Sequence, residues 1–393
     1  KTDRFKYLYG QDFLMVKKVV EASVAVAHGV RLCRPDVIPM YPITPQTHIV
    51  EKLASFINDG ILDSEMIHME SEHSALSAAL GASATGVRTF SATASQGLAL
   101  MHEVLFVVSG MRLPIVMSIA NRALSAPINI WNDHQDSISA RDSGWMQFYA
   151  ESSQEALDTM IIAYKIAENK EILLPAMVCI DGFTLSHVYE PVDIPEQKSV
   201  DSFLSKYKPL YKLDPEKPLT MGPVGFPDSF MYFKHAQQKA MESALQVIKK
   251  VNTEFKQQFG RDYGDGILEG YKMNDAKQAV VCMGSVCGTV RVAVDKMRKE
   301  GKKVGMIKLK TYRPFPKKRL VEISKGLKGM AVLDKNISFG NYGALFTDLK
   351  AVLSDKIMMN NFIIGLGGRD ITVKHVESVV DKIGSKKDIE WIY

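Results

Sequence analysis

Short apolar runs alternate with helix-like stretches along the first half of the chain. The runs are nearly continuous in apolar residues, which is typical of strands whose two faces are both covered by helices. Strands that alternate with helices favour a parallel, doubly wound α/β sheet. The runs lie at residues 37–40, 66–69, 87–92, 114–119, 145–150 and 173–180, and the main helix-like stretches at 72–86, 96–110 and 153–168.

This pattern divides the chain into three segments. Residues 1–190 hold the alternation and are expected to form the first α/β domain. Residues 191–274 are rich in proline and then show a long charged helix at about 232–259, so we expect a connector that lies over the first domain. Residues 275–393 predict a second, smaller α/β domain. Its expected strands are 279–283, 304–309, 329–333 and 361–364, and its expected helices lie near 288–300, 316–327, 342–353 and 373–383.

Composition excludes several classes of protein. The net charge is only +5 and the lysine pairs are scattered, so we expect no nucleic-acid partner. Four cysteines without a C-x-x-C pair indicate neither a disulfide framework nor an iron–sulfur or zinc site in this chain. No apolar run approaches the roughly 18 residues of a membrane span, and the first residues do not resemble a signal peptide. We therefore expect a cytoplasmic protein with no membrane partner.

The segment Tyr41-Pro42-Ile43-Thr44-Pro45 joins the first apolar run to a helix-like stretch. Its two prolines stiffen the backbone and disfavour helical angles at the residues before them. The crossing therefore presents one small hydroxyl, that of Thr44. In an open α/β sheet, ligands bind at such crossings, at the carboxyl ends of the strands. A proline-rich turn that only starts a helix is the alternative interpretation.

Glu70-Ser71-Glu72-His73 follows the second apolar run and opens a helix. Glu72 is expected in the first helical turn, where the helix dipole favours a carboxylate by about 0.3–1 kcal/mol. Acidic residues are also common at helix starts for purely structural reasons. The motif is therefore compatible with either a catalytic or a structural carboxylate.

Three further motifs follow later strands. Thr93-Ala94-Ser95-Gln96-Gly97 offers hydroxyls, an amide and a glycine to a ligand, or simply caps a helix. Asn121-Arg122-Ala123 places a guanidinium that can hold a carboxylate through a two-pronged hydrogen bond or make a structural salt bridge. The loop Asn132–Asp136 contains two acids and one histidine, but it matches no known ligand set, and we predict no metal site in this chain.

Taken together, the ordered motifs Y-P-I-T-P, E-S-E-H, T-A-S-Q-G, N-R-A and N-D-H-Q-D resemble those of the α subunits of pyruvate:ferredoxin oxidoreductases, which are 2-oxoacid:ferredoxin oxidoreductases. The resemblance extends from about residue 20 to the end and includes Y-R-P-F-P at 312–316 and G-L-G-G at 365–368. It implies that the first domain binds the pyrimidine half of thiamine diphosphate. It also implies that the second domain resembles the C-terminal domain of transketolase.

The resemblance gives roles to individual residues. It implies that Glu72 is the catalytic carboxylate, which hydrogen-bonds N1′ of the aminopyrimidine. It implies that Arg122 binds the carboxylate of the 2-oxoacid and that the Thr44 hydroxyl binds the substrate beside it. Ser95 and Gln96 are predicted to contact the cofactor.

The implied activity is oxidative decarboxylation of pyruvate with CoA to acetyl-CoA and CO2, with electrons passing to ferredoxin, or the reverse reaction. Gly264-Asp265-Gly266 lies outside a strand–helix crossing, so it does not predict a diphosphate site. The resemblance instead places the diphosphate, Mg²⁺ and [4Fe-4S] clusters on partner subunits of a hetero-oligomer with β, γ and δ chains.

Two alternatives stay open. The same chemistry on another 2-oxoacid is one, with 2-oxoglutarate, a branched-chain acid, an aryl pyruvate or oxalate as substrate. Gln46-Thr47 bears on this choice, because related chains commonly carry serines there. A non-catalytic scaffold subunit is the other.

Overall fold

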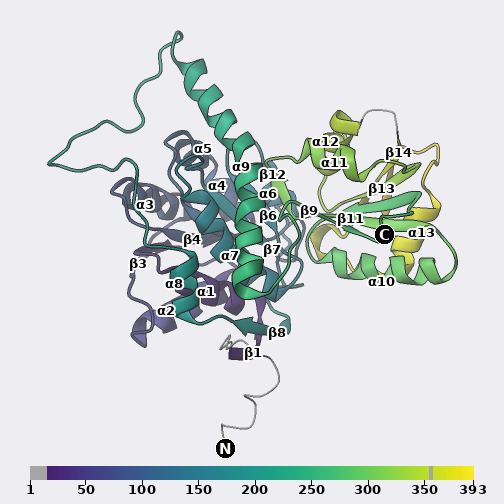
Figure 1. Cartoon of the computed structure of the whole chain (residues 1–393), viewed down its shortest axis with the longest axis horizontal. Helices are drawn as coiled ribbons and strands as arrows, with labels where there is room; N and C mark the ends of the chain where they lie inside the picture. Colours follow the sequence, from purple (N-terminus) through teal and green to yellow (C-terminus); the bar gives the residue numbers. More distant parts are fainter. Residues whose placement is uncertain (1–15, 354–356) are drawn as a thin grey trace, which may run out of the picture.

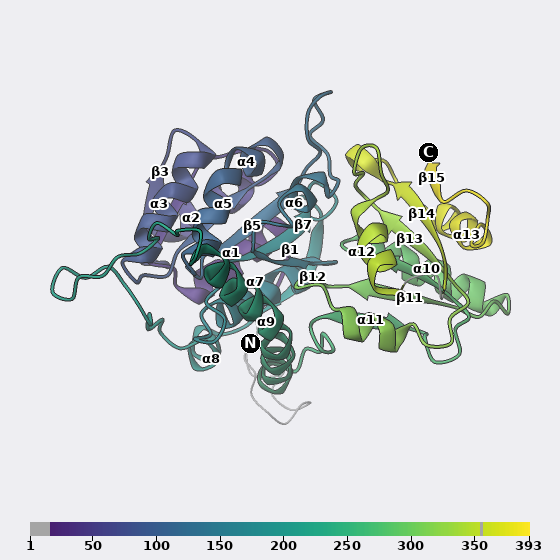
Figure 2. The ribbon, with the colours of Figure 1, turned by 90° about the horizontal axis from the view of Figure 1, so that it is seen from above.

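The computed structural model describes residues 16–353 and 357–393. Two α/β units lie side by side, each with its own central sheet (Figures 1 and 2). The long helix α9 (Phe230–Phe259) lies against the first unit, where it packs on α7 (Ser153–Ala167).

The first unit confirms the doubly wound parallel sheet expected from the sequence. Its strands are β2 (Val37–Met40), β3 (Glu65–His68), β4 (Phe90–Thr93), β5 (Val116–Asn121), β6 (Met146–Tyr149), β7 (Ala176–Asp181) and β12 (Thr311–Arg313). The five-stranded sheet has the order β12-β6-β7-β5-β4, in which only β12 runs antiparallel to its neighbour. The parallel pair β2-β3 extends this arrangement beyond β4, to which it is linked by an isolated bridge between Val37 and Thr89.

Both faces of this sheet are buried, which explains the continuous apolar runs. Val116 packs in a core with α1 (Ala22–Cys33) and α7, whereas its neighbour Met117 packs in a second core with α3 (Glu72–Ala84) and α5 (His102–Gly110). Successive residues of a strand point to opposite faces, so each face needs its own apolar set. The remaining helices of this unit are α2 (Thr47–Asn58), α4 (Ser95–Leu100) and α6 (Gln135–Ser139).

The structure corrects two expectations about single elements. The helix expected over 96–110 is two helices, α4 and α5, because the chain turns at the buried Met101. The connector begins with β8 (Tyr189–Ile194), which pairs antiparallel with β1 (Val16–Glu21). Pro191 did not indicate a strand, yet proline is tolerated there because β8 pairs on one side only.

The second unit has a central six-stranded sheet. Its elements are β9 (Leu268–Tyr271), β10 (Gln278–Cys282), α10 (Val286–Lys299), β11 (Val304–Leu309), α11 (Lys317–Ile323), β13 (Gly329–Asp334), α12 (Ala344–Leu353), β14 (Met358–Ile364), α13 (Val373–Asp381) and β15 (Ile389–Ile392). The strand order is β15-β14-β13-β10-β11-β9. All neighbours are parallel except β9, which is antiparallel to β11. Helices α10 and α13 cover one face, and α11 and α12 cover the other.

The two units exchange strands. β9 comes from the expected connector but joins the second sheet, and β12 comes from the expected second domain but joins the first sheet. The connector also contains α8 (Gln197–Phe203) and an extended arm at residues 206–229 that projects away from the body of the first unit (Figure 1). Pairing preferences across sheets are not visible in a local pattern, so the sequence did not indicate these exchanges.

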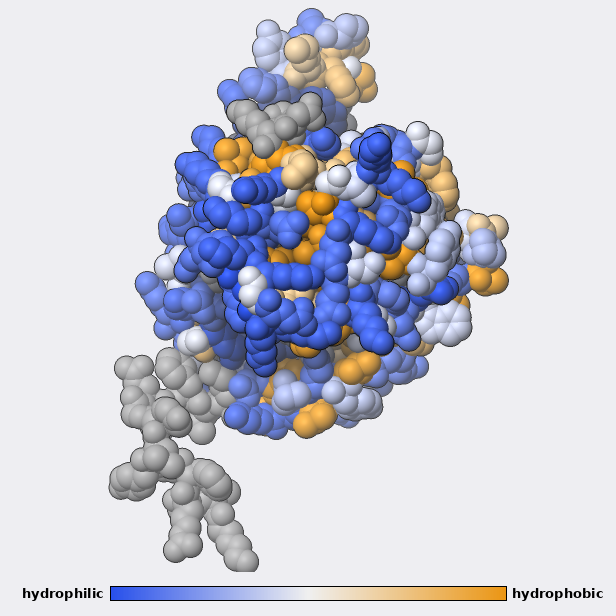
Figure 3. Space-filling view, turned by 90° about the vertical axis from the view of Figure 1, so that its right-hand side faces the viewer, coloured by the Kyte–Doolittle hydropathy of each residue, from blue (hydrophilic) through white to orange (hydrophobic). Residues whose placement is uncertain are grey.

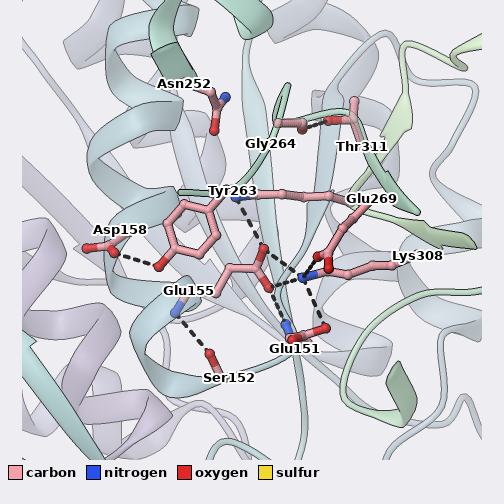
Figure 4. Close-up of polar contacts among 12 residues, drawn as sticks. Glu151, Ser152, Glu155, Asp158, Asn252, Tyr263, Gly264, Glu269, Lys308 and Thr311 are labelled. Carbon is pink, nitrogen blue, oxygen red and sulfur yellow. Dashed lines mark hydrogen bonds and ion pairs between the residues drawn. The ribbon is translucent and has the colours of Figure 1, made fainter. Parts of the chain in front are cut away.

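A buried ion network joins α7 to the second sheet (Figure 4). Lys308 Nζ lies 2.9 Å from Glu155 Oε2 and 3.1 Å from Glu151 Oε2, and the Lys308 and Glu155 side chains are almost completely buried. Lys310 Nζ lies 3.3 Å from Glu155 Oε1 and 4.0 Å from the ring centre of Tyr263. Burial alone would raise the pKa of Glu155, but Lys310 and Lys308 lower it to about 2.

Charged and polar side chains cover most of the face seen in Figure 3, on which apolar side chains are scattered. Within residues 16–353 and 357–393, no helix combines the length and apolarity needed to cross a membrane. Cys33, Cys179, Cys282 and Cys287 are all buried and none forms a disulfide, although the Sγ atoms of Cys282 and Cys287 lie 3.5 Å apart, within hydrogen-bond distance.

Candidate active site

The predicted site residues lie at the carboxyl ends of neighbouring strands. Thr44 follows β2, Ser95 follows β4 and Arg122 follows β5, while Glu72 follows β3 and begins α3. Because these strands are parallel, their carboxyl ends share one edge of the sheet.

The carboxylate of Glu72 is almost buried and has no partner among the described residues. Ser71 caps α3 by accepting a hydrogen bond from the Ser74 N–H, which places Glu72 at the first helical position. Only 7% of Glu72 is exposed, and its carboxylate makes no hydrogen bond or ion pair with any residue that the structure describes. A buried carboxylate with unused acceptors is poised to bind a donor supplied from outside the chain.

Gly97 shapes the space beside this carboxylate. A Cβ atom at Gly97 would lie 2.6 Å from Glu72 Oε1 and 2.3 Å from Thr93 Oγ1, so only glycine leaves both oxygens in place. The Thr93 hydroxyl is buried and likewise has no partner within the described residues. An unpaired carboxylate and an unpaired hydroxyl on one side of a glycine form a donor and acceptor set suited to a nitrogen heterocycle.

Arg122 and Thr44 are brought together, although 78 positions separate them. Arg122 Nη1 donates to the Thr44 carbonyl at 3.0 Å, and Nε donates to the Asn129 carbonyl at 3.1 Å. The arginine is 8% exposed, and its Nη2 has no hydrogen-bond partner among the described residues. Thr44 itself is exposed. The Arg122 guanidinium therefore offers a positive charge with free donors next to the backbone of Thr44, which suits a small carboxylate.

Ser95 and Gln96 are engaged within the chain. Ser95 is fully buried, and its hydroxyl lies within hydrogen-bond distance of the Ala123 carbonyl and of Gln96 Oε1. Its φ of +49° belongs to the left-handed region, which a non-glycine residue rarely adopts. The geometry links these residues to the segment that carries Arg122, and their contact with a cofactor stays a prediction.

Asp136 is a central residue that the sequence did not reveal. Its Oδ2 accepts hydrogen bonds from the backbone N–H groups of Ser95, at 2.9 Å, and Arg122, at 3.0 Å. Its Oδ1 accepts from Asn121 Nδ2 and the Ser137 N–H, both at 2.7 Å. Burial raises the pKa of Asp136 to about 7, against the lowering effect of these donors. One carboxylate thus ties the end of β4 to the end of β5.

The only hint of Asp136 in the sequence is the acidic loop Asn132–Asp136. Within the described residues, no group of three or more histidine, cysteine, aspartate or glutamate side chains is arranged to hold a metal ion. The loop instead makes hydrogen bonds across the fold.

Asp181 continues this polar core into the second unit. Its carboxylate lies 2.8 Å from His134 Nε2 and 2.9 Å from Lys335 Nζ, and it also accepts from the Ser285 hydroxyl. Burial alone would raise the pKa of Asp181, but Lys335, His134 and Ser285 hold it well below its ordinary value. Lys335 and Ser285 both follow strands of the second sheet, so the second unit contributes to this edge.

Comparison with protein families identifies two matching regions. Residues 28–253 match the model described as "Pyruvate flavodoxin/ferredoxin oxidoreductase, thiamine diP-bdg". Residues 276–376 match "Pyruvate:ferredoxin oxidoreductase core domain II". The two regions together account for most of the chain.

Curated relatives resemble the chain over nearly its whole length. "Pyruvate synthase subunit PorA" of Methanocaldococcus jannaschii is 54% identical over 94% of this chain and 96% of the relative. The PorA subunit of Pyrococcus furiosus is 53% identical over 93% of each chain. "Ketoisovalerate oxidoreductase subunit VorA" of Pyrococcus horikoshii is 48% identical over 96% of this chain and 98% of the relative.

Solved structures share the fold. A 2-oxoglutarate:ferredoxin oxidoreductase from Magnetococcus marinus aligns with a TM-score of 0.74 at 19% identity, over 93% of this chain and 65% of that chain. A split-gene transketolase aligns with a TM-score of 0.53 at 12% identity, over 92% of this chain and 97% of that chain. At these identities the likeness concerns the fold alone.

Proposed function

The chain belongs to the pyruvate flavodoxin/ferredoxin oxidoreductase family, and from this membership we propose that it is the α subunit of a pyruvate:ferredoxin oxidoreductase. The complex would convert pyruvate, CoA and oxidised ferredoxin to acetyl-CoA, CO2 and reduced ferredoxin, or run the reverse reaction. The nearly buried carboxylate of Glu72, which has no partner in the part of the chain that the structure describes, is the observation that carries the proposal.

The residues around Glu72 fit the aminopyrimidine of thiamine diphosphate. Glu72 would bind the ring nitrogen N1′ and hold or release a proton there, which is the work of a general acid–base carboxylate. Gly97 leaves room for the Glu72 carboxylate, and the Thr93 hydroxyl offers a second polar contact beside it. When bound, the cofactor supplies the nucleophile and the electron sink for decarboxylation. The described residues of this chain offer no cluster of metal ligands.

Arg122 and Thr44 would orient the 2-oxoacid. The free edge of the Arg122 guanidinium would bind the substrate carboxylate, while its bonds to the Thr44 and Asn129 carbonyls fix its direction. We further propose that Mg²⁺, the diphosphate site and the [4Fe-4S] clusters lie on β, γ and δ subunits, and that ferredoxin receives the electrons. The names of the relatives as subunits support such an assembly.

The activity of the co-expressed complex with a panel of 2-oxoacids tests whether pyruvate is the preferred substrate. We expect kcat/KM to be highest for pyruvate in a panel that includes 2-oxoisovalerate, 2-oxoglutarate, an aryl pyruvate and oxalate. The ketoisovalerate oxidoreductase relatives, at 48% identity, favour the branched-chain acid as the second candidate. A higher kcat/KM for 2-oxoisovalerate would transfer the proposal to that substrate. A complex that turns over no 2-oxoacid and retains no thiamine diphosphate would support a scaffold instead.

Replacing Arg122 with lysine is expected to raise the KM for pyruvate by about 10- to 100-fold, with a smaller change in kcat. A hydrogen bond to a charged group contributes about 1.5–3 kcal/mol, and lysine lacks the planar fork. Thr44→Ala should have a smaller effect, because it removes a neutral partner. Steady-state kinetics of the complex measures both.

Arg141→Lys serves as the control, because Arg141 is half-buried and its Nη1 binds the Ile138 carbonyl. It should leave the KM within about twofold. An unchanged KM in Arg122→Lys would show that another group binds the substrate carboxylate.

A further inference from the structure

The loop that carries Arg122 rests on a turn of the second unit. We call residues 122–134 the arginine loop and residues 365–369 the glycine turn. Asn129 Nδ2 donates to the Gly367 carbonyl at 3.1 Å, and the Gly368 N–H donates to the Asn132 carbonyl at 2.6 Å. The Gly367 N–H donates in turn to Asp133 Oδ2 at 3.2 Å. The loop is thus hydrogen-bonded to the glycine turn at several points along its length.

Asn129 connects this contact directly to the guanidinium. Its carbonyl accepts from Arg122 Nε at 3.1 Å, and its Oδ1 accepts from the Trp131 N–H at 2.8 Å. Its Nδ2 is the group that binds Gly367. The Trp131 carbonyl closes the loop by accepting from the Ala123 N–H at 3.0 Å. A shift of the glycine turn would therefore move Asn129, and with it an acceptor that aims Arg122.

The glycine turn fits the arginine loop so closely that side chains are excluded. A Cβ at Gly368 would lie 2.3 Å from the Trp131 Cβ, which cannot give way unless the loop backbone moves. A Cβ at Gly367 would lie 2.5 Å from Asn129 Nδ2. Gly367 and Gly368 also have positive φ, of +59° and +81° respectively. These close approaches give a physical reason for the G-L-G-G motif that does not involve a phosphate.

We propose that the glycine turn of the second unit positions the Arg122 guanidinium and that Asn129 is the positioning residue through which it acts. The proposal rests on the function proposed above, in which Arg122 binds the carboxylate of a 2-oxoacid. It gives the second unit a part in substrate binding, although none of its residues need touch the substrate.

The test compares two glycine variants in the co-expressed complex. Gly368→Ala is expected to raise the KM for pyruvate by about 10-fold or more, with kcat and the retention of thiamine diphosphate nearly unchanged. Gly340→Ala is the matched control, because Gly340 lies in the same unit with a φ of +82° and a Cβ added there would meet nothing within 4 Å. It carries the same backbone strain without the contact, so its KM should stay within about twofold of the wild type.

Asn129→Ala provides the second variant. It creates no clash, so it decides the question if Gly368→Ala fails to assemble, and it should raise the KM in the same way. A general loss of folding would lower kcat through fewer active sites and would leave the KM unchanged. Equal KM values in Asn129→Ala and the wild type would overturn the proposal, as would equal values in Gly368→Ala and Gly340→Ala.

Failure of the proposed function would look different. In that case the wild-type complex would not turn over pyruvate, or Arg122→Lys would leave the KM unchanged. If the wild type is active and Arg122→Lys raises the KM while Gly368→Ala and Asn129→Ala keep the wild-type KM, only the positioning role is wrong.

Discussion

Replacing Glu72 with glutamine is expected to lower kcat/KM for pyruvate by about 10²- to 10⁴-fold, the usual contribution of a positioned general acid–base group. Glutamine keeps the size of the side chain and one acceptor oxygen, but it cannot exchange a proton with the ring nitrogen of the cofactor. The effect should be large because the Glu72 carboxylate is held close against Gly97, where a Cβ atom would lie 2.6 Å from its Oε1. Pyruvate-dependent ferredoxin reduction by the co-expressed complex is the measurement.

Glu70→Gln is the matched control for this variant. Glu70 is the same residue type two positions earlier, but it is exposed and its carboxylate accepts a hydrogen bond from the Ser74 hydroxyl. We expect its activity to stay within about twofold of the wild type. Undiminished pyruvate oxidation by Glu72→Gln would refute the catalytic role of Glu72.

Replacing Lys308 with methionine is expected to destabilise the protein by about 3–5 kcal/mol, because it removes one partner of a buried ion network. Glu155 would keep Lys310, but Glu151 would lose its contact with Lys308, and three carboxylates would face fewer positive charges. The midpoint of thermal unfolding measures the loss. Lys302→Met is the control, since the pair of Lys302 with Asp381 is exposed and should contribute less than about 1 kcal/mol.

The same network predicts a dependence of stability on pH. The pKa of Glu155 is about 2 in the folded protein against an ordinary value of 4.5, so its ionised form stabilises the fold. This stabilisation, on the order of 3 kcal/mol, is present above pH 4.5 and is lost as the pH falls towards 2. Thermal midpoints across this range should fall less steeply in Glu155→Gln than in the wild type. If the midpoints of Glu155→Gln and the wild type fell in parallel with pH, the low pKa of Glu155 in the folded protein would be contradicted.

Much of the fold could be predicted because its signals are local. Continuous apolar runs mark strands covered on both faces, and β2 and β11 have the bounds expected from the sequence. Ser71 and Glu72 also have local signals, since a cap and an acid in the first turn mark a helix start. Strands β1, β8, β9, β12 and β15 were missed, and β8, β9 and β12 lie where prolines or glycines obscure the pattern.

The sequence by itself determined the class of sheet, the order of its elements and the chemical types of side chain at the strand ends. It did so because hydrophobic periodicity, caps and turn residues act over a few positions along the chain. Only the tertiary structure decided which of these side chains meet. Arg122 bonds to the Thr44 carbonyl, Asp136 joins Ser95 to Arg122, and the glycine turn holds Asn129. These contacts depend on strand order and on the packing of the two units, which bring together residues separated by tens to hundreds of positions.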